Sequence, residues 1–145
     1  MIYYRNDVRR SGVDGRALVA TAKRLLVAIG EGASALSLSL VRDEAIRTLN
    51  REYRGKDRPT DVLSFPLGEP PGRPQRLLGD VVISVDAARR QAHEYDATLQ
   101  RELYRLLIHG LLHLMGHDHL AVSERRVMRR EERRLADTIA LPWPY

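Results

Sequence analysis

The residues best suited to chemistry are histidines gathered late in the chain. His109, His113 and His119 are spaced by four and six residues, and Gly116 lies between the second and the third. Residues four apart share one face of an α-helix, so the imidazoles of His109 and His113 can point at one ion. A glycine just past the last helical turn adopts a left-handed conformation at low cost, which ends the helix and brings His119 back. The spacing therefore predicts a three-histidine metal site with a fourth position open.

This coordination predicts a catalytic zinc ion. Catalytic zinc keeps three protein ligands and an open position, whereas structural zinc takes four ligands rich in cysteine, and this chain has no cysteine. The ligands and the glycine match the metzincin peptidase pattern H-E-x-x-H-x-x-G-x-x-H, but Gly110 replaces the glutamate. That glutamate is the general base of the peptidases, so Gly110 argues against proteolysis by that route. We predict one Zn²⁺ ion per chain, held by His109, His113 and His119.

Two neighbouring residues leave alternatives open. His117 lies two residues before His119 and is an alternative third ligand or an assistant to it, although His119 fits the template position. Asp118 either orients a ligand imidazole or is a solvated turn carboxylate, because spacing does not identify such partners.

Length and composition indicate one cytoplasmic domain, residues 1–145, with no membrane association. The apolar stretches are far shorter than a membrane span, and the first residues lack the apolar segment of a secretion signal. The formal net charge is +5, and only two of the 24 basic residues, Lys23 and Lys56, are lysines. Guanidinium groups bind phosphate in a bidentate way, which favours a nucleic-acid partner. Nucleotide bias of the genome is the alternative source of so much arginine.

Hydrophobic periodicity predicts an α+β domain with a single mixed β-sheet of about four strands covered by helices. The order of the strands does not follow from the sequence. The last helix interleaves arginines with Glu124, Glu131 and Glu132, which indicates a solvated face of opposite charges, with RNA contact as the alternative. The expected strands are 2–5, 35–41, 62–65 and 81–85, the expected helices are 14–30, 43–54, 86–95, one from 98 onward and 123–140, and 67–76 is an exposed loop.

Three segments together resemble one known family. Residues His109 to His119 are similar to the H-G-x-L-H-L-x-G-Y-D-H signature of the YbeY endoribonucleases, bacterial ribosomal-RNA maturation factors. Residues 50–66 resemble the second motif of that family and residues 79–84 the third. The resemblance covers most of the chain in length, motif order and spacing. One position departs from the signature, because His117 stands where the family usually has tyrosine.

The resemblance implies a zincin-like fold in which a three-histidine helix holds zinc through His109, His113 and His119. It also implies that Arg54 is the functional arginine of the second motif, where a guanidinium would offset transition-state charge on phosphate. The implied activity is a zinc-dependent, single-strand-specific endoribonuclease acting in 16S ribosomal RNA 3′-end maturation and ribosome quality control. The implied partners are single-stranded RNA, ribosomal RNA, the small ribosomal subunit and ribosome-assembly proteins.

Two other functions remain as alternatives. One is a metzincin-like metallopeptidase that recruits another carboxylate as its base. The other is a non-catalytic ribosome-assembly factor that binds ribosomal RNA and uses its metal mainly for folding. At the level of residues, Arg54 alternatively faces the last carbonyls of its own helix. Structural roles are expected ahead of catalytic ones for the acidic residues of the motifs and of the metal helix, which are Asp57, Asp61, Asp80 and Glu102.

Overall fold

One four-stranded sheet organises the chain, and the computed structural model describes residues 1–70, 73, 75–118 and 120–143. The sheet order is β1-β2-β4-β3, with β1, β2 and β4 parallel and β3 antiparallel to β4. This is the mixed sheet that the sequence predicts, with β3 as an edge strand. The strands are β1 (Ile2–Asn6), β2 (Ala35–Val41), β3 (Val62–Pro66) and β4 (Leu77–Ser84).

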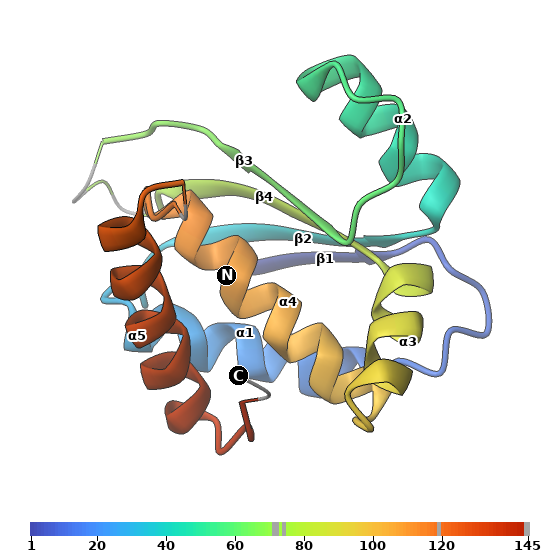
Figure 1. Cartoon of the computed structure of the whole chain (residues 1–145). Coiled ribbons are helices and arrows are strands. Elements are labelled where there is room, and N and C mark those ends of the chain that lie inside the picture. The colour runs from blue at the N-terminus through green and yellow to red at the C-terminus, as the bar shows by residue number, and fades with distance from the viewer. Residues whose placement is uncertain (71–72, 74, 119, 144–145) are drawn as a thin grey trace.

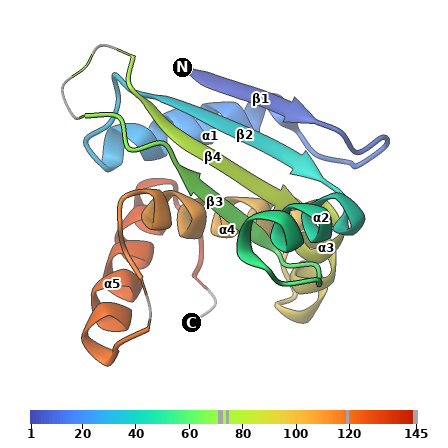
Figure 2. The same cartoon turned by 90° about the horizontal axis from the view of Figure 1, so that it is seen from above.

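Helices cover both faces of this sheet unequally. The helices α1, α4 and α5 lie on one face, and α2 lies on the other (Figure 1). Seen from above, α2 and α3 lie near the same end of the sheet (Figure 2). Their bounds are α1 (Gly15–Ala28), α2 (Asp43–Arg54), α3 (Val85–Glu94), α4 (Leu99–Leu114) and α5 (Val122–Thr138). In the part of the chain that the structure describes, no helix is long and apolar enough to cross a membrane.

The two faces of the sheet carry hydrophobic cores of different size. Side chains alternate along a strand, so β2 turns Leu36, Leu38 and Leu40 toward the larger core with α1 and α4. The smaller core lies under α2 and contains Val41, Ile46, Leu63 and Val82. Helix α4 therefore packs in the larger core, whereas α2 packs only against the smaller one.

One predicted boundary is wrong by four residues. Strand β4 begins at Leu77, not at position 81, because Leu77 already pairs with Ala35 of β2. Gly79 lies within this extension at φ +149°, and a Cβ there would meet the Phe65 carbonyl oxygen at 2.2 Å. Glycine inside a strand marks such a close backbone approach, but in a sequence it resembles a loop residue. The other predicted boundaries agree with the structure to within two residues.

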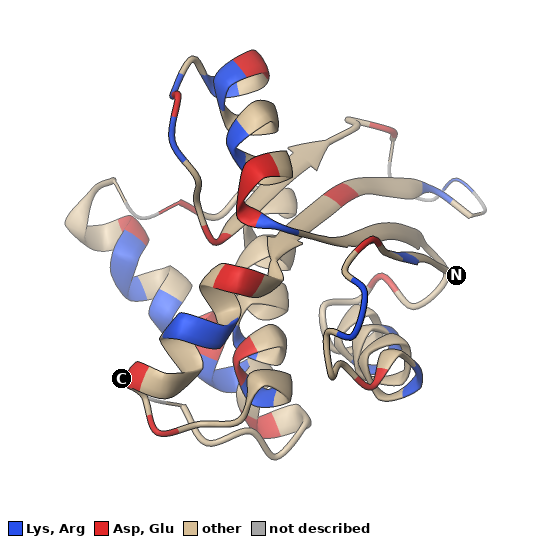
Figure 3. Ribbon diagram, turned by 90° about the vertical axis from the view of Figure 1, so that its right-hand side faces the viewer, with Lys and Arg blue, Asp and Glu red and all other residues tan. Residues whose placement is uncertain are grey.

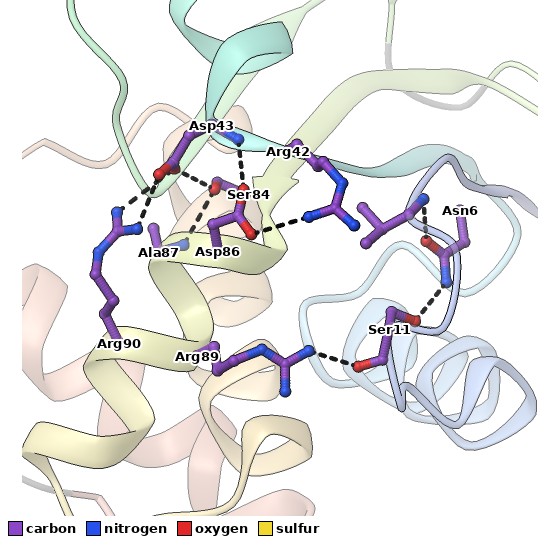
Figure 4. Close-up of polar contacts among 10 residues, drawn as sticks. Asn6, Ser11, Arg42, Asp43, Ser84, Asp86, Ala87, Arg89 and Arg90 are labelled. Carbon is purple, nitrogen blue, oxygen red and sulfur yellow. Dashed lines mark hydrogen bonds and ion pairs between the residues drawn. The ribbon is translucent and has the colours of Figure 1, made fainter.

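Polar contacts fix the start of α2 against α3 at the ends of β2 and β4 (Figure 4). The Ser84 hydroxyl donates to Asp43 Oδ1 at 2.7 Å, and Arg90 Nη1 donates to Asp43 Oδ2 at 2.8 Å. The Arg90 guanidinium holds the pKa of Asp43 below its ordinary value. Asp86 Oδ2 accepts from the Asp43 backbone N–H at 3.0 Å. These contacts set the direction in which α2 leaves the sheet.

Candidate active site

A cleft of about 810 Å³ runs along the edge strand β3. One wall is the end of α2 with the loop that follows it, and the other is the end of α4 with the turn that follows it. The lining residues are Asn50, Arg54, Lys56, Arg58, Pro59, Thr60, Asp61, Val62, Leu63, Ser64, Pro66, His109, His113, Gly116, His117 and Asp118. The cleft therefore joins two of the segments that the sequence singled out, although they lie about fifty residues apart in the chain.

His109 and His113 converge inside this cleft. Their Nε2 atoms are 3.0 Å apart, and the two rings meet edge to face with centroids 4.6 Å apart. Four-coordinate zinc with bonds of about 2.0–2.1 Å holds two ligand nitrogens roughly 3.3 Å apart. The observed separation, which is also a hydrogen-bond distance, is close to this value, and neutral imidazole is a preferred zinc donor.

The third predicted ligand, His119, lies outside the described residues. Among the residues that the structure does describe, no group of three His, Cys, Asp or Glu side chains could hold a metal ion. Two residues that the sequence left open, His117 and Asp118, both line the cleft beside the histidine pair. The three-histidine site, and with it the zincin-like detail of the fold, therefore stays a prediction.

The end of α4 turns as the sequence predicts. Gly116 has φ +90°, and its N–H donates to the His113 carbonyl at 3.0 Å. The N–H of His117 donates to the Leu112 carbonyl, also at 3.0 Å. This pair of bonds is a Schellman motif, in which a left-handed residue closes the helix and reverses the chain. The turn keeps His117 next to the last turn of α4.

Gly110 lets α4 approach the sheet closely. A Cβ at this position would lie 2.8 Å from Val81 Cγ1, 3.2 Å from Ser64 Oγ and 3.3 Å from Val62 Cγ2. The Ser64 hydroxyl instead donates to the Gly110 carbonyl at 2.8 Å, a contact that ties β3 to α4. A glutamate, which the peptidase pattern has here, would not fit without moving the helix. Close packing against the sheet therefore requires glycine at position 110, which also explains why the glutamate of the peptidase pattern is absent there.

Arg54 reaches from the last residue of α2 to the sheet. Its Nη2 donates to the Ser64 carbonyl at 2.6 Å, and its guanidinium carbon lies 5.6 Å from the centroid of the Phe65 ring. The side chain thus contacts β3 and lines the cleft, not the carbonyls at the end of its own helix. Gly55 ends α2 at φ +69°, and Asn50 Nδ2 donates to the Arg58 carbonyl at 2.9 Å. These contacts shape the loop that forms this wall.

The part of α2 and its loop that lines the cleft contains three cations, Arg54, Lys56 and Arg58, and one acid, Asp61. Figure 3 shows both basic and acidic residues along this helix and the following loop. Lys56 and Arg58 are exposed and line the cleft. The one acid between them, Asp57, faces Arg47 at 3.0 Å and Arg51 at 3.9 Å, and Arg47 lowers the pKa of its carboxyl. The Asp57 carboxylate therefore faces arginines of α2 and does not line the cleft.

Two of the other acids predicted to be structural, Asp61 and Glu102, have hydrogen-bond partners. Asp61 Oδ1 accepts from the Val62 N–H at 2.8 Å, and its Oδ2 accepts from Gln91 Nε2 at 3.2 Å. Glu102 is 2% exposed and receives two hydrogen bonds from the buried Arg105, so it lies in the core and does not line the cleft. Asp80 lies within β4 opposite Phe65.

One residue near the histidines differs from its predicted place. The charge pattern of the last helix predicts that Glu132 lies on a solvated face, but Glu132 is only 7% exposed, and its Oε1 lies 3.8 Å from His109 Nδ1. The ion pair on the outer side is Arg134 with Glu131 at 2.7 Å. The available signal was helical spacing, because Glu132 falls in line with the buried Met128, Leu135 and Ala136.

Comparison with known proteins gives the family. The family model described as Endoribonuclease YbeY matches residues 6–140. The chain belongs to the YbeY family. A relative named Endoribonuclease YbeY from Anaeromyxobacter sp. (strain Fw109-5) is 52% identical over 121 residues, which are 83% of this chain and 62% of that protein. One of the same name from Myxococcus xanthus is 58% identical over 106 residues, 72% of this chain and 36% of that protein.

These two family members are longer proteins, of which this chain spans less than two thirds. A relative named Endoribonuclease YbeY from Pelotomaculum thermopropionicum is 52% identical over 120 residues, which are 79% of this chain and 79% of that protein. A Thermotoga maritima protein with a known solution structure matches with a TM-score of 0.60 and 26% identity, over 97% of this chain and 92% of that one. The α+β fold therefore recurs in a solved structure.

The contact at Gly110 predicts a stability cost for the smallest side chain. Gly110→Ala should destabilise the protein, because overpacking costs about 1–3 kcal/mol and the better helix propensity of alanine returns only about 1 kcal/mol. The free energy of unfolding from urea titrations measures the loss. In a Val81→Ala background the same change should cost less, because the nearest clashing methyl is gone. A Gly110→Ala protein more stable than the parent would contradict this packing.

Proposed function

We propose that this chain is a zinc-dependent endoribonuclease that cleaves single-stranded RNA. The observation that carries the proposal is the pair of imidazole nitrogens 3.0 Å apart in a cleft whose opposite wall holds Arg54, Lys56 and Arg58. The naming of family members as Endoribonuclease YbeY supports the substrate class and the reaction.

The residues of the cleft have two proposed roles in phosphodiester cleavage, which are metal binding and stabilisation of negative charge. His109 and His113 would hold zinc through Nε2, together with His119. When bound, zinc supplies Lewis acidity toward phosphate oxygens and water. Arg54 offsets the negative charge that builds on the phosphate. Its guanidinium has five N–H donors, and within the described part of the chain one of them is engaged, with the Ser64 carbonyl.

The exposed cations of the wall bind the RNA backbone. Lys56 and Arg58 line the cleft beyond Arg54, where phosphates on either side of the cleaved bond would pass. Such contacts carry little sequence information, so they suit a substrate chosen by its accessibility as a single strand. The family resemblance extends the proposal to the 3′ end of 16S ribosomal RNA, ribosome quality control in the cytoplasm, and contacts with the small subunit and assembly proteins.

The histidine pair makes the zinc requirement testable. His113→Ala should lose bound zinc and RNA cleavage while keeping its fold, because His113 is half-buried at the cleft and contributes one of the two converging nitrogens. Zinc content, circular dichroism and cleavage of a labelled single-stranded RNA measure the three properties. The matched control is His93→Ala, which removes an exposed histidine from α3 outside the cleft and should change none of them. A zinc-loaded parent that binds RNA without cutting it would instead favour the assembly-factor alternative.

Arg54 should affect the rate without affecting the metal. Arg54→Ala should lower kcat by roughly 10²–10³-fold, the usual loss for one transition-state donor, while zinc content stays that of the parent. Arg54→Lys should recover only part of the rate, since lysine keeps the charge but not the planar fork. The control is Arg51→Ala on the same helix, whose side chain faces Asp57. An unchanged kcat, or a loss equal to that of Arg51→Ala, would exclude this role.

A further inference from the structure

A buried carboxylate lies behind the histidine pair, on the inner face of α5. Glu132 is 7% exposed and shares this face with the apolar residues Met128, Leu135 and Ala136. A carboxylate withdrawn from water among apolar groups is costly unless a polar partner faces it. The partner here is the imidazole of His109, whose Nδ1 lies 3.8 Å from Glu132 Oε1.

The two ring nitrogens of His109 face different groups. Its Nε2 faces His113 Nε2 at 3.0 Å, and its Nδ1 faces the Glu132 carboxylate. A carboxylate favours the tautomer with a proton on Nδ1, which leaves the Nε2 lone pair directed toward His113. This is the protonation state that a zinc ligand bound through Nε2 requires.

We infer that Glu132 is a positioning residue for the metal site, which fixes the tautomer and the ring orientation of His109. This inference rests on the proposed zinc-dependent function and names a residue outside the ligand set. Glu132 does not line the cleft, so it acts through His109 and does not touch substrate. Carboxylates that support a histidine ligand in this way commonly strengthen metal binding by about 10–100-fold.

The neighbouring Glu131 provides a matched control. It is half-buried on the same helix, but its carboxylate accepts from Arg134 Nε at 2.9 Å and from Arg134 Nη2 at 2.7 Å. Arg134 lowers the pKa of Glu131. Substituting either glutamate by glutamine removes one negative charge from α5 with almost no change in volume. Glu131 also lies close enough to His117 for a weak electrostatic interaction, but only Glu132 faces a member of the proposed ligand set, His109, His113 and His119, within the described part of the chain.

Zinc dissociation constants, measured by competition with a chromophoric chelator, test this role. Glu132→Gln should bind zinc about 10–100-fold more weakly than the parent. Glu131→Gln should stay within about twofold of the parent, because its carboxylate faces Arg134. Equal zinc affinity for the two variants would overturn the inference while leaving the nuclease proposal intact. A parent protein that binds no zinc would overturn both.

A second measurement needs no variant and is independent of how Glu132→Gln folds. In the zinc-loaded parent protein, nitrogen-15 chemical shifts report which nitrogen of His109 carries the proton. The inference predicts a proton on Nδ1 and zinc at Nε2. A protonated Nε2, or zinc bound through Nδ1, would overturn it.

Discussion

The contact between α4 and the sheet at Gly110 sets the geometry of the whole site. Three side-chain atoms of β3 and β4 lie 2.8–3.3 Å from where a Cβ would be, and the Ser64 hydroxyl donates to the Gly110 carbonyl at 2.8 Å. The next residue back along the helix is His109, and the next turn carries His113. Because the interior is close-packed, an added side chain at 110 would move both imidazoles relative to β3 and to the arginine bonded to it.

The two walls of the cleft differ in how firmly they are held. Helix α4 packs in the main core, with Leu103, Leu107 and Leu111 fully buried. Helix α2 buries only Ile46 and Asn50, and polar contacts hold it at both ends, through Asp43 at the start and Arg54 at the end. A region with few buried apolar contacts opens more easily than the core. The histidines thus lie on the wall that packs in the larger core, and the cations proposed to bind RNA lie on the wall with fewer buried apolar contacts.

Features that depend on neighbouring residues could be predicted from the sequence, whereas features that depend on distant segments could not. Periodicity and capping residues located the helices, and Gly116 predicted the turn after α4, because these signals act within a few residues. The sheet order, the early start of β4 at Leu77 and the clash that selects Gly110 depend on segments far apart in the chain. Glu132 was missed for the same reason, since its charge suggested an exposed face and only the packing of α5 turns it toward His109.

Anomalous diffraction at the zinc absorption edge, from crystals of the zinc-loaded protein, tests the central claim most directly. The claim is that the approach of α4 to the sheet prepares two imidazole nitrogens for one ion. We predict a single zinc peak at about 2.0–2.1 Å from Nε2 of both His109 and His113, within the cleft that also contains Arg54. A zinc peak that is bonded to neither nitrogen, or that lies outside this cleft, would contradict it.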